Sequence, residues 1–148
     1  MKSVLDLNTR NELITRIKSL HQDSARQWGT MTLTQMLKHC TRCEKLYFGE
    51  VKVKRSFLGR LIGQMALKGM LKEGATLSRN APTASTMKVT DKEGNIDTEK
   101  QHWIRQIERY ADLPDKPFNH WFFGKMTPDQ LGQFVYKHAD HHLRQFSA

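Results

Sequence analysis

The chain has 148 residues, of which 38% are hydrophobic, and its 24 Lys and Arg against 15 Asp and Glu give a formal net charge of +9. This length and composition predict one globular domain, residues 1–148, and exclude a disordered or membrane-like protein. No apolar run approaches the roughly 20 residues needed to cross a bilayer, and the first residues lack the apolar stretch of a signal peptide. We therefore expect a cytoplasmic protein without a membrane partner.

The positive charge permits an acidic partner such as nucleic acid. However, the basic residues are spread along the whole chain, and no helix-turn-helix, zinc-finger or RNA-binding motif occurs among them. A basic solvated surface is the simpler interpretation, and nucleic-acid binding is the less favoured function. The two cysteines, Cys40 and Cys43, are three residues apart and provide no disulfide framework.

Four segments begin with the capping-box pattern, in which a Thr is followed three residues later by Glu or Gln. These Thr residues are Thr9, Thr32, Thr98 and Thr127. Apolar residues recur at helical spacing after each of them, so each is expected to begin an amphipathic helix. The expected helices cover about residues 9–21, 32–48, 97–113 and 127–146.

A fifth helix is predicted over residues 56–71, although three glycines within it each cost roughly 1 kcal/mol relative to alanine. We expect Gly59, Gly63 and Gly69 to permit close packing against a neighbouring helix. Residues 73–97 show no regular pattern, and they either follow the surface or cover the mouth of a pocket. The fold class is therefore all-α, a four-helix bundle with an additional helix inserted between the second and third main helices.

Residues 116–126 form an aromatic connector with no alternating strand pattern, and no such pattern of any length occurs elsewhere in the chain. The aromatic side chains need apolar cover, so this segment is expected to plug the bundle beside the last helix. It contains His120, for which a hydrogen bond to backbone is the commoner arrangement and a contact with a functional site the alternative.

Along the buried face of the last predicted helix, the side chains are aliphatic in the first half and include histidines in the second half. Counted from Leu131 at about 100° per residue, His138 lies at about −20° and His142 at about +20°. Two histidines four residues apart on one inward face form a metal-ligand geometry. His141 lies at about −80°, at the edge of the face. On the second helix, His39 lies within the apolar arc and also points inward.

The two helices together offer His39, His138 and His142 as ligands of a divalent metal ion. Three neutral imidazoles with an open fourth position suit Zn, Ni, Co or Fe. Cys43, one turn after His39, could instead close the site as a fourth ligand. Other side chains that could support the ligands or a bound molecule are Gln35, His120 and His141. The alternative is a polar helix end together with a hydrogen-bonded core histidine, without a metal.

Several of these stretches resemble the DinB-like superfamily. Residues 28–31 (WGTM) and 35–40 (QMLKHC) are similar to its segment of a tryptophan followed by Met-Leu-x-His, and residues 138–145 (HADHHLRQ) resemble its terminal histidine motif. Residues 120–127 (HWFFGKMT) resemble a short-chain branch known as a domain of unknown function. The resemblance implies a helical bundle that binds a divalent metal through one histidine of the second helix and two of the last. These positions are His39, His138 and His142.

Some members of that superfamily are thiol-dependent transferases and isomerases. The resemblance therefore favours a metal-dependent thiol S-transferase that acts on a small-molecule thiol. A metal that holds water instead would make the protein a hydrolase, and basic residues near the site, such as Arg144, would hold an anionic thiol or carboxylate substrate. Leu143, between His142 and Arg144, departs from the general family pattern, so detailed substrate contacts do not carry over. The alternative is a non-catalytic, metal-stabilised binding or interaction module, which could form a homodimer through exposed helix faces.

Overall fold

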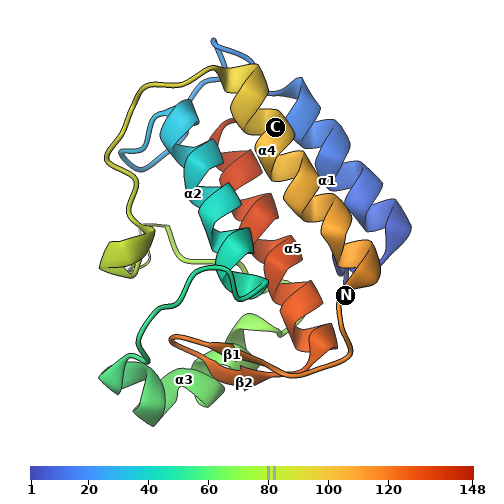
Figure 1. The fold of residues 1–148 in the computed structure, drawn as a ribbon, viewed down its shortest axis with the longest axis vertical. Coiled ribbons are helices and arrows are strands. Elements are labelled where there is room, and N and C mark those ends of the chain that lie inside the picture. Colours follow the sequence, from blue (N-terminus) through green and yellow to red (C-terminus); the bar gives the residue numbers. More distant parts are fainter. Residues whose placement is uncertain (80, 82) are drawn as a thin grey trace.

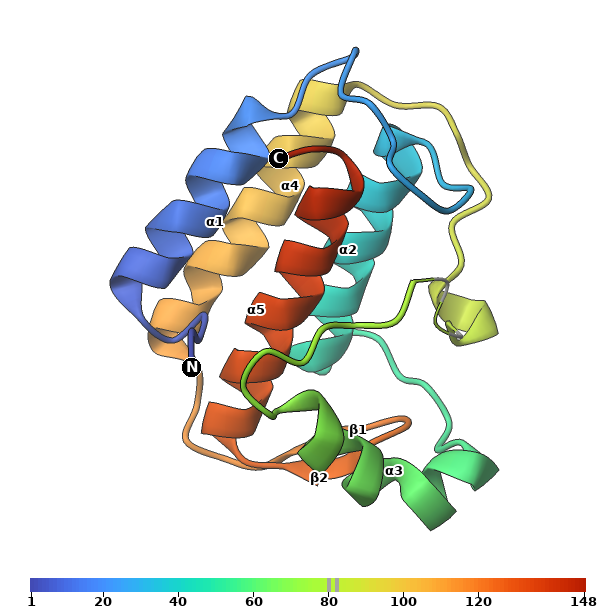
Figure 2. The same cartoon turned by 180° about the vertical axis from the view of Figure 1, so that it is seen from behind.

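Four helices lie side by side and enclose the core in the computed structural model, which describes residues 1–79, 81 and 83–148 (Figure 1, Figure 2). They are α1 (Leu7–Ser19), α2 (Leu33–Tyr47), α4 (Ile96–Glu108) and α5 (Pro128–Gln145). Helix α2 packs against α4 and α5, and α1 packs against the same two helices. Helix α3 (Phe57–Met70) is inserted between the second and third of these helices, in the order predicted.

The fold is mostly helical, as predicted, but it also contains a small antiparallel sheet. Strands β1 (Phe118–His120) and β2 (Gly124–Met126) pair with Asn119 opposite Lys125. The prediction of a connector without strands was wrong because each strand has only three residues, too few for an alternating pattern to be visible. Two short 3-10 helices, Ser85–Met87 and Arg109–Asp112, complete the described elements.

Two of the four predicted capping boxes are confirmed. The Thr32 side chain accepts the Gln35 N–H while the Gln35 side chain accepts the Thr32 N–H, and Thr127 and Gln130 form the same pair at the start of α5. Each box satisfies two backbone donors that the helix itself leaves unpaired. The two helices that carry the candidate ligands therefore begin at the residues that the sequence indicates.

The other two predicted boxes were wrong. Helix α1 begins at Leu7, because the Asp6 side chain accepts the Thr9 N–H, and α4 is capped in the same way by Asn95 on Thr98. Asp and Asn are stronger N-cap residues than Thr, so the acceptor three residues earlier takes the capping position. Both Thr residues consequently lie inside the helices that they were expected to begin.

Helix α3 lies apart from the four packed helices, against the β1–β2 hairpin (Figure 2). Gly59 and Gly63 do permit a close approach, although the neighbour is not a helix. A Cβ atom would lie 2.3 Å from the Phe122 carbonyl oxygen at Gly59 and 2.2 Å from it at Gly63. The chain approaches so closely because the first half of α3 turns its glycine side toward the hairpin.

The segment between α3 and α4 runs along α2 and supplies backbone acceptors to it. The Gln35 side chain donates to the carbonyl oxygens of Val89 and Thr90, and the His39 imidazole contacts the Met87 carbonyl oxygen. The described part of this segment therefore covers the α2 residues from which the candidate site is built. No helix of the described residues is long and apolar enough to span a membrane.

Candidate metal centre

Three buried histidines from two helices meet between α2 and α5. The exposed fraction is 5% for His39 and 7% for both His138 and His142. One ligand atom from each imidazole lies within 4.8 Å of the others, and such a group could hold a metal ion. The ring centroids of His138 and His142 are 4.7 Å apart because the two residues occupy successive turns of α5.

Hydrogen bonds orient two of the three rings. Nδ1 of His39 lies 3.2 Å from the Met87 carbonyl oxygen, which can only accept, so Nδ1 carries the proton and Nε2 keeps its lone pair, with the Cys43 thiol as its neighbour. Nδ1 of His142 lies 2.9 Å from Oε1 of Gln145. The Gln145 amide is itself oriented, since its Nε2 donates to the Trp28 carbonyl oxygen. Both histidines thus present Nε2 as the ligand atom, in the way that hydrogen-bonded partners orient metal ligands.

The third ring has no such partner. Nδ1 of His138 is buried and forms no hydrogen bond with any described residue. A buried polar atom without a partner is costly, typically about 1–3 kcal/mol. His138 packs instead between the Phe134 and Tyr47 rings, at centroid distances of 6.1 and 6.4 Å. Its chemistry therefore fits a ligand position better than a satisfied core position.

The environment keeps all three imidazoles neutral at neutral pH. Burial is the largest cause that lowers the pKa of His39, of His138 and of His142, and the pKa of His142 falls to about 3. The neighbouring histidines lower the pKa of His138 and of His142 further, because each disfavours a second positive charge close by. Neutral imidazoles are the form that binds a metal ion.

Cys43 lies beside the three histidines without joining the group of converging ligand atoms. Its Sγ is 3.6 Å from Nε2 of His39. Burial, together with the nearby Glu44 carboxyl, raises the pKa of the thiol well above its usual range. The thiol therefore remains protonated in the metal-free protein, whereas a metal ligand would be a thiolate.

The other supporting residues have separate contacts. The Gln35 side chain closes the α2 capping box and holds residues 89 and 90. His141 is buried against Trp28 and His142, with ring centroids 5.4 and 5.1 Å away. Nδ1 of His120 accepts the N–H groups of two residues of the hairpin turn, Phe122 and Phe123. His141 thus adjoins the three histidines, while Gln35 and His120 have contacts that hold the backbone.

Two partners of the ligand rings were not predicted from the sequence. Gln145 could have been found, because it lies one turn after His142 on the same helix. The contact with the Met87 carbonyl could not be predicted, because every residue has a carbonyl oxygen and the position of this one depends on the path of the segment before α4.

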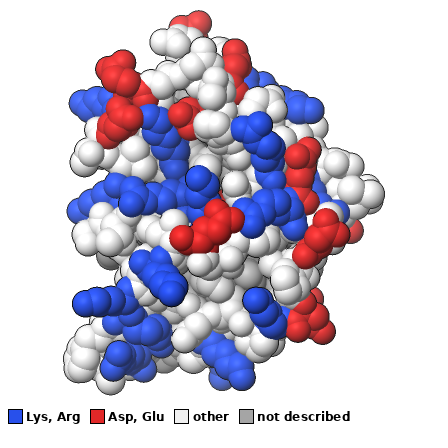
Figure 3. Space-filling model, in the orientation of Figure 1, with Lys and Arg blue, Asp and Glu red and all other residues white. Residues whose placement is uncertain are grey.

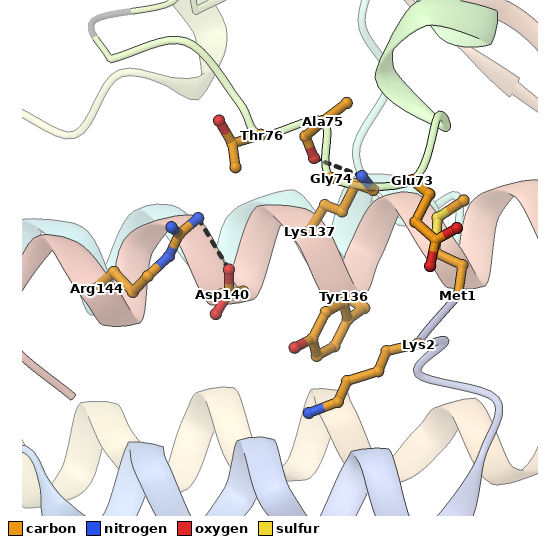
Figure 4. A pocket seen from close by; sticks show the side chains of 10 residues that line it. All are labelled: Met1, Lys2, Glu73, Gly74, Ala75, Thr76, Tyr136, Lys137, Asp140 and Arg144. Carbon is orange, nitrogen blue, oxygen red and sulfur yellow. Dashed lines mark hydrogen bonds and ion pairs between the residues drawn. The ribbon is translucent and has the colours of Figure 1, made fainter.

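An open cavity beside α5 is lined by none of the three histidines (Figure 4). It has a volume of about 320 Å³ and includes Lys137, Asp140 and Arg144 in its lining. Lys137 donates to the carbonyl oxygens of Lys72 and Ala75, while Arg144 pairs with Asp140. These charged groups are already partnered, so the cavity does not extend the histidine site.

A comparison with protein families matches residues 1–148 to the family described as "Protein of unknown function (DUF1569)". The match covers the whole chain. No curated protein and no solved structure matches it.

Proposed function

We propose that this chain, which belongs to the DUF1569 family of proteins of unknown function, binds a divalent transition metal through His39, His138 and His142 and uses it in catalysis. The observation that carries the proposal is a group of three buried, neutral imidazoles whose ligand atoms lie within 4.8 Å of one another. Imidazole nitrogen suits Zn, Ni, Co and Fe, and is a poor ligand for Mg and Ca.

Three protein ligands leave a coordination position for a reactant. A metal ion held there would supply Lewis-acid chemistry, in which a water or thiol at the open position has a lowered pKa and becomes a nucleophile at neutral pH. The protein orients two of the rings through the Met87 carbonyl and Gln145, and it excludes water with the aromatic rings beside His138. The resemblance to the DinB-like superfamily supports a thiol S-transferase or a hydrolase as the reaction class.

A cationic group is available for an anionic substrate. The Arg79 guanidinium lies 4.5 Å from the centroid of the Trp28 ring, which in turn packs on His141 next to His142. A guanidinium held in this way can receive a carboxylate or another anionic group. The contact supports a small anionic thiol or acid as the substrate.

A metal-stabilised module without turnover is the second candidate, and the position of Cys43 favours it. Its Sγ, 3.6 Å from Nε2 of His39, is close enough for a small side-chain rotation to add a thiolate as fourth ligand. Four protein ligands are typical of structural zinc sites, whereas three are typical of catalytic ones. The number of protein ligands therefore separates the two functions.

The first experiment measures metal content by elemental analysis of protein purified without chelator. We expect close to one metal ion per chain in the wild type and a large loss in His138→Ala and His142→Ala. His21→Ala is the matched control, because His21 is exposed and distant in sequence from these ligands. Wild-type protein that neither retains a metal nor gains thermal stability when Zn, Ni, Co or Fe is added would refute the proposal.

Cobalt substitution then separates the two candidates. A Co(II) protein with three imidazoles and an exchangeable ligand should change its visible spectrum when a small thiol is added. A closed site would instead show a thiolate charge-transfer band without added thiol, and Cys43→Ala would abolish that band. The second result would replace the catalytic proposal with the structural one.

A further inference from the structure

Helix α3 has an apolar surface that no described part of the chain covers. The exposed fraction is 78% for Phe57, 54% for Leu58, 69% for Leu61, 36% for Ile62 and 70% for Met65. We call these five residues the α3 face. Together they expose the equivalent of about three whole side chains, on the order of 500 Å², which is the size of the largest apolar patch on a typical monomer, a patch that often has a function.

This arrangement reverses the usual one for a surface helix. The buried residues of α3 are Gly59, Gly63 and Leu67, so most of its large side chains point outward and two glycines point inward. On a helix with about 100° per residue, the α3 face lies almost opposite the buried residues. A helix that is apolar on both sides is normally covered on both sides, which indicates a second contact surface.

Polar contacts hold α3 firmly in this orientation. The Arg55 guanidinium donates to the carbonyl oxygens of Trp121 and Phe122 in the hairpin turn. Further along, the Gln64 side chain donates to the carbonyl oxygens of Phe123 and Lys125. With the Gly59 and Gly63 contacts, these bonds prevent α3 from rotating to bury its large side chains. The exposure of the α3 face is therefore built into the fold.

The charge around the α3 face has one sign. Residues 51–72 contain no Asp or Glu, and their basic residues are Lys52, Lys54, Arg55, Arg60, Lys68 and Lys72. All except Arg55 are exposed, and none of them forms an ion pair with a described residue. The lower left of Figure 3, where α3 lies in Figure 1, accordingly shows Lys and Arg among uncoloured residues.

We propose that α3 docks the protein on an anionic lipid surface, with the α3 face among the acyl chains and the surrounding lysines and arginines at the headgroups. Interfacial helices that bind membranes combine an apolar face containing Phe and Leu with Lys and Arg beside it. Each basic residue near an anionic bilayer adds to the attraction. This partner was not expected from the sequence, because the periodicity does not reveal which side of α3 is covered.

A second copy of the chain fits this surface less well. Two α3 faces in contact would bring together ten exposed basic side chains with no acidic residue from these segments between them. The apolar area also falls short of the roughly 800 Å² per partner that a stable interface buries. Helix α3 lies outside the four packed helices at one end of the molecule (Figure 1). This position leaves the α3 face free to lie on a flat bilayer, whereas two such protruding faces would form no groove for each other.

The test is co-sedimentation of the full chain with lipid vesicles. Wild-type protein should sediment with phosphatidylcholine vesicles that contain a quarter of phosphatidylglycerol, and remain in solution with phosphatidylcholine alone. The double substitution Leu61→Glu with Met65→Glu should reduce the bound fraction at least about tenfold, since it places two charges on the apolar face. High salt should weaken the wild-type binding, because the Debye length falls from about 10 Å at 0.1 M to about 3 Å at 1 M.

Leu7→Glu is the matched control, because Leu7 is 61% exposed on a different helix. It should bind vesicles like the wild type, and circular dichroism should show that all variants are folded. The proposal would be overturned if wild-type protein does not sediment with the vesicles that contain phosphatidylglycerol, or if the double variant sediments with them as well as the wild type does. A wild-type dimer in analytical ultracentrifugation that becomes monomeric in the double variant, without vesicle binding, would assign the α3 face to a second copy instead. The test is independent of the metal centre.

Discussion

Lowering the pH should destabilise the metal-free protein through its buried histidines, and His142 allows the size of the effect to be worked out. Its pKa falls from 6.5 to about 3 on folding, mainly because of burial. Between these two values the unfolded chain binds a proton that the folded protein does not. The free energy of unfolding therefore decreases as the pH falls through this window.

The expected magnitude is a large fraction of the roughly 5–15 kcal/mol that stabilises a typical domain. At about pH 5, this one proton lowers the free energy of unfolding by about 2 kcal/mol relative to neutral pH, and the limit below pH 3 is roughly 5 kcal/mol. The pKa values of His39 and His138 are lowered as well, so the combined contribution of the three histidines is steeper, whereas the buried Glu44 carboxyl, whose pKa is raised, contributes in the opposite direction. In His142→Gln the unfolded chain no longer binds a proton at this position. The free energy of unfolding should therefore vary less with pH, by the amount given for His142.

The assay is urea unfolding of wild type and His142→Gln between pH 7.5 and pH 5, with chelator present and tryptophan fluorescence as the signal. The comparison uses the change with pH in each protein, so a general loss of stability in the variant does not affect it. His21→Gln is the control, because His21 is exposed. If wild type and His142→Gln lose stability in parallel as the pH falls, His142 is not held neutral by burial and the reasoning fails.

Three further predictions follow from individual contacts. Gly63→Ala should destabilise the protein by at least about 2 kcal/mol, since its Cβ would meet the Phe122 carbonyl oxygen, whereas Gly69→Ala, with nothing within 4 Å, should be neutral or stabilising in the same urea titration. The pKa of Glu44 is raised to about 7 by burial, so the contribution of this carboxyl to stability should fall by about 3 kcal/mol as the pH rises from 4.5 to 7, and Glu44→Gln should remove this contribution and make the rise in stability due to the histidines steeper. Chelator should lower the melting temperature of protein purified with its metal, and added Zn should restore it; no response to either would contradict the assignment.

The starts of α2 and α5 could be predicted because each capping box is a local pattern. The same pattern failed at Thr9 and Thr98, where an Asp or Asn three residues earlier is the better cap. The convergence of the candidate ligands was also predictable, since His138 and His142 lie on one helical stripe and His39 lies within the apolar arc of α2. The cap residues and the inward direction of each histidine are contained within one or two helical turns, whereas the meeting of α2 with α5 follows from the bundle that the helices were expected to form.

The remaining features depend on contacts between distant segments. The hairpin strands are too short to show an alternating pattern, and the Met87 carbonyl reaches His39 only because the segment before α4 runs along α2. The direction of α3 is a further example, since its periodicity is compatible with burial of either side. The side of α3 that is buried is determined by the close approach of Gly59 and Gly63 to the Phe122 backbone.

The three histidines reduce the stability of the metal-free chain, and this cost is itself an argument for a ligand. Imidazoles are more costly to bury than hydrocarbon, and the unpartnered Nδ1 of His138 adds about 1–3 kcal/mol. Leu, Met or Phe at His138 would fill the space beside Phe134 and Tyr47 without that cost. A structural role alone thus gives no reason for three imidazoles at this place in the core. A metal ion held by these imidazoles, as proposed, would offset the cost with binding free energy, so the proposal predicts that the metal-bound protein is more stable than the metal-free one.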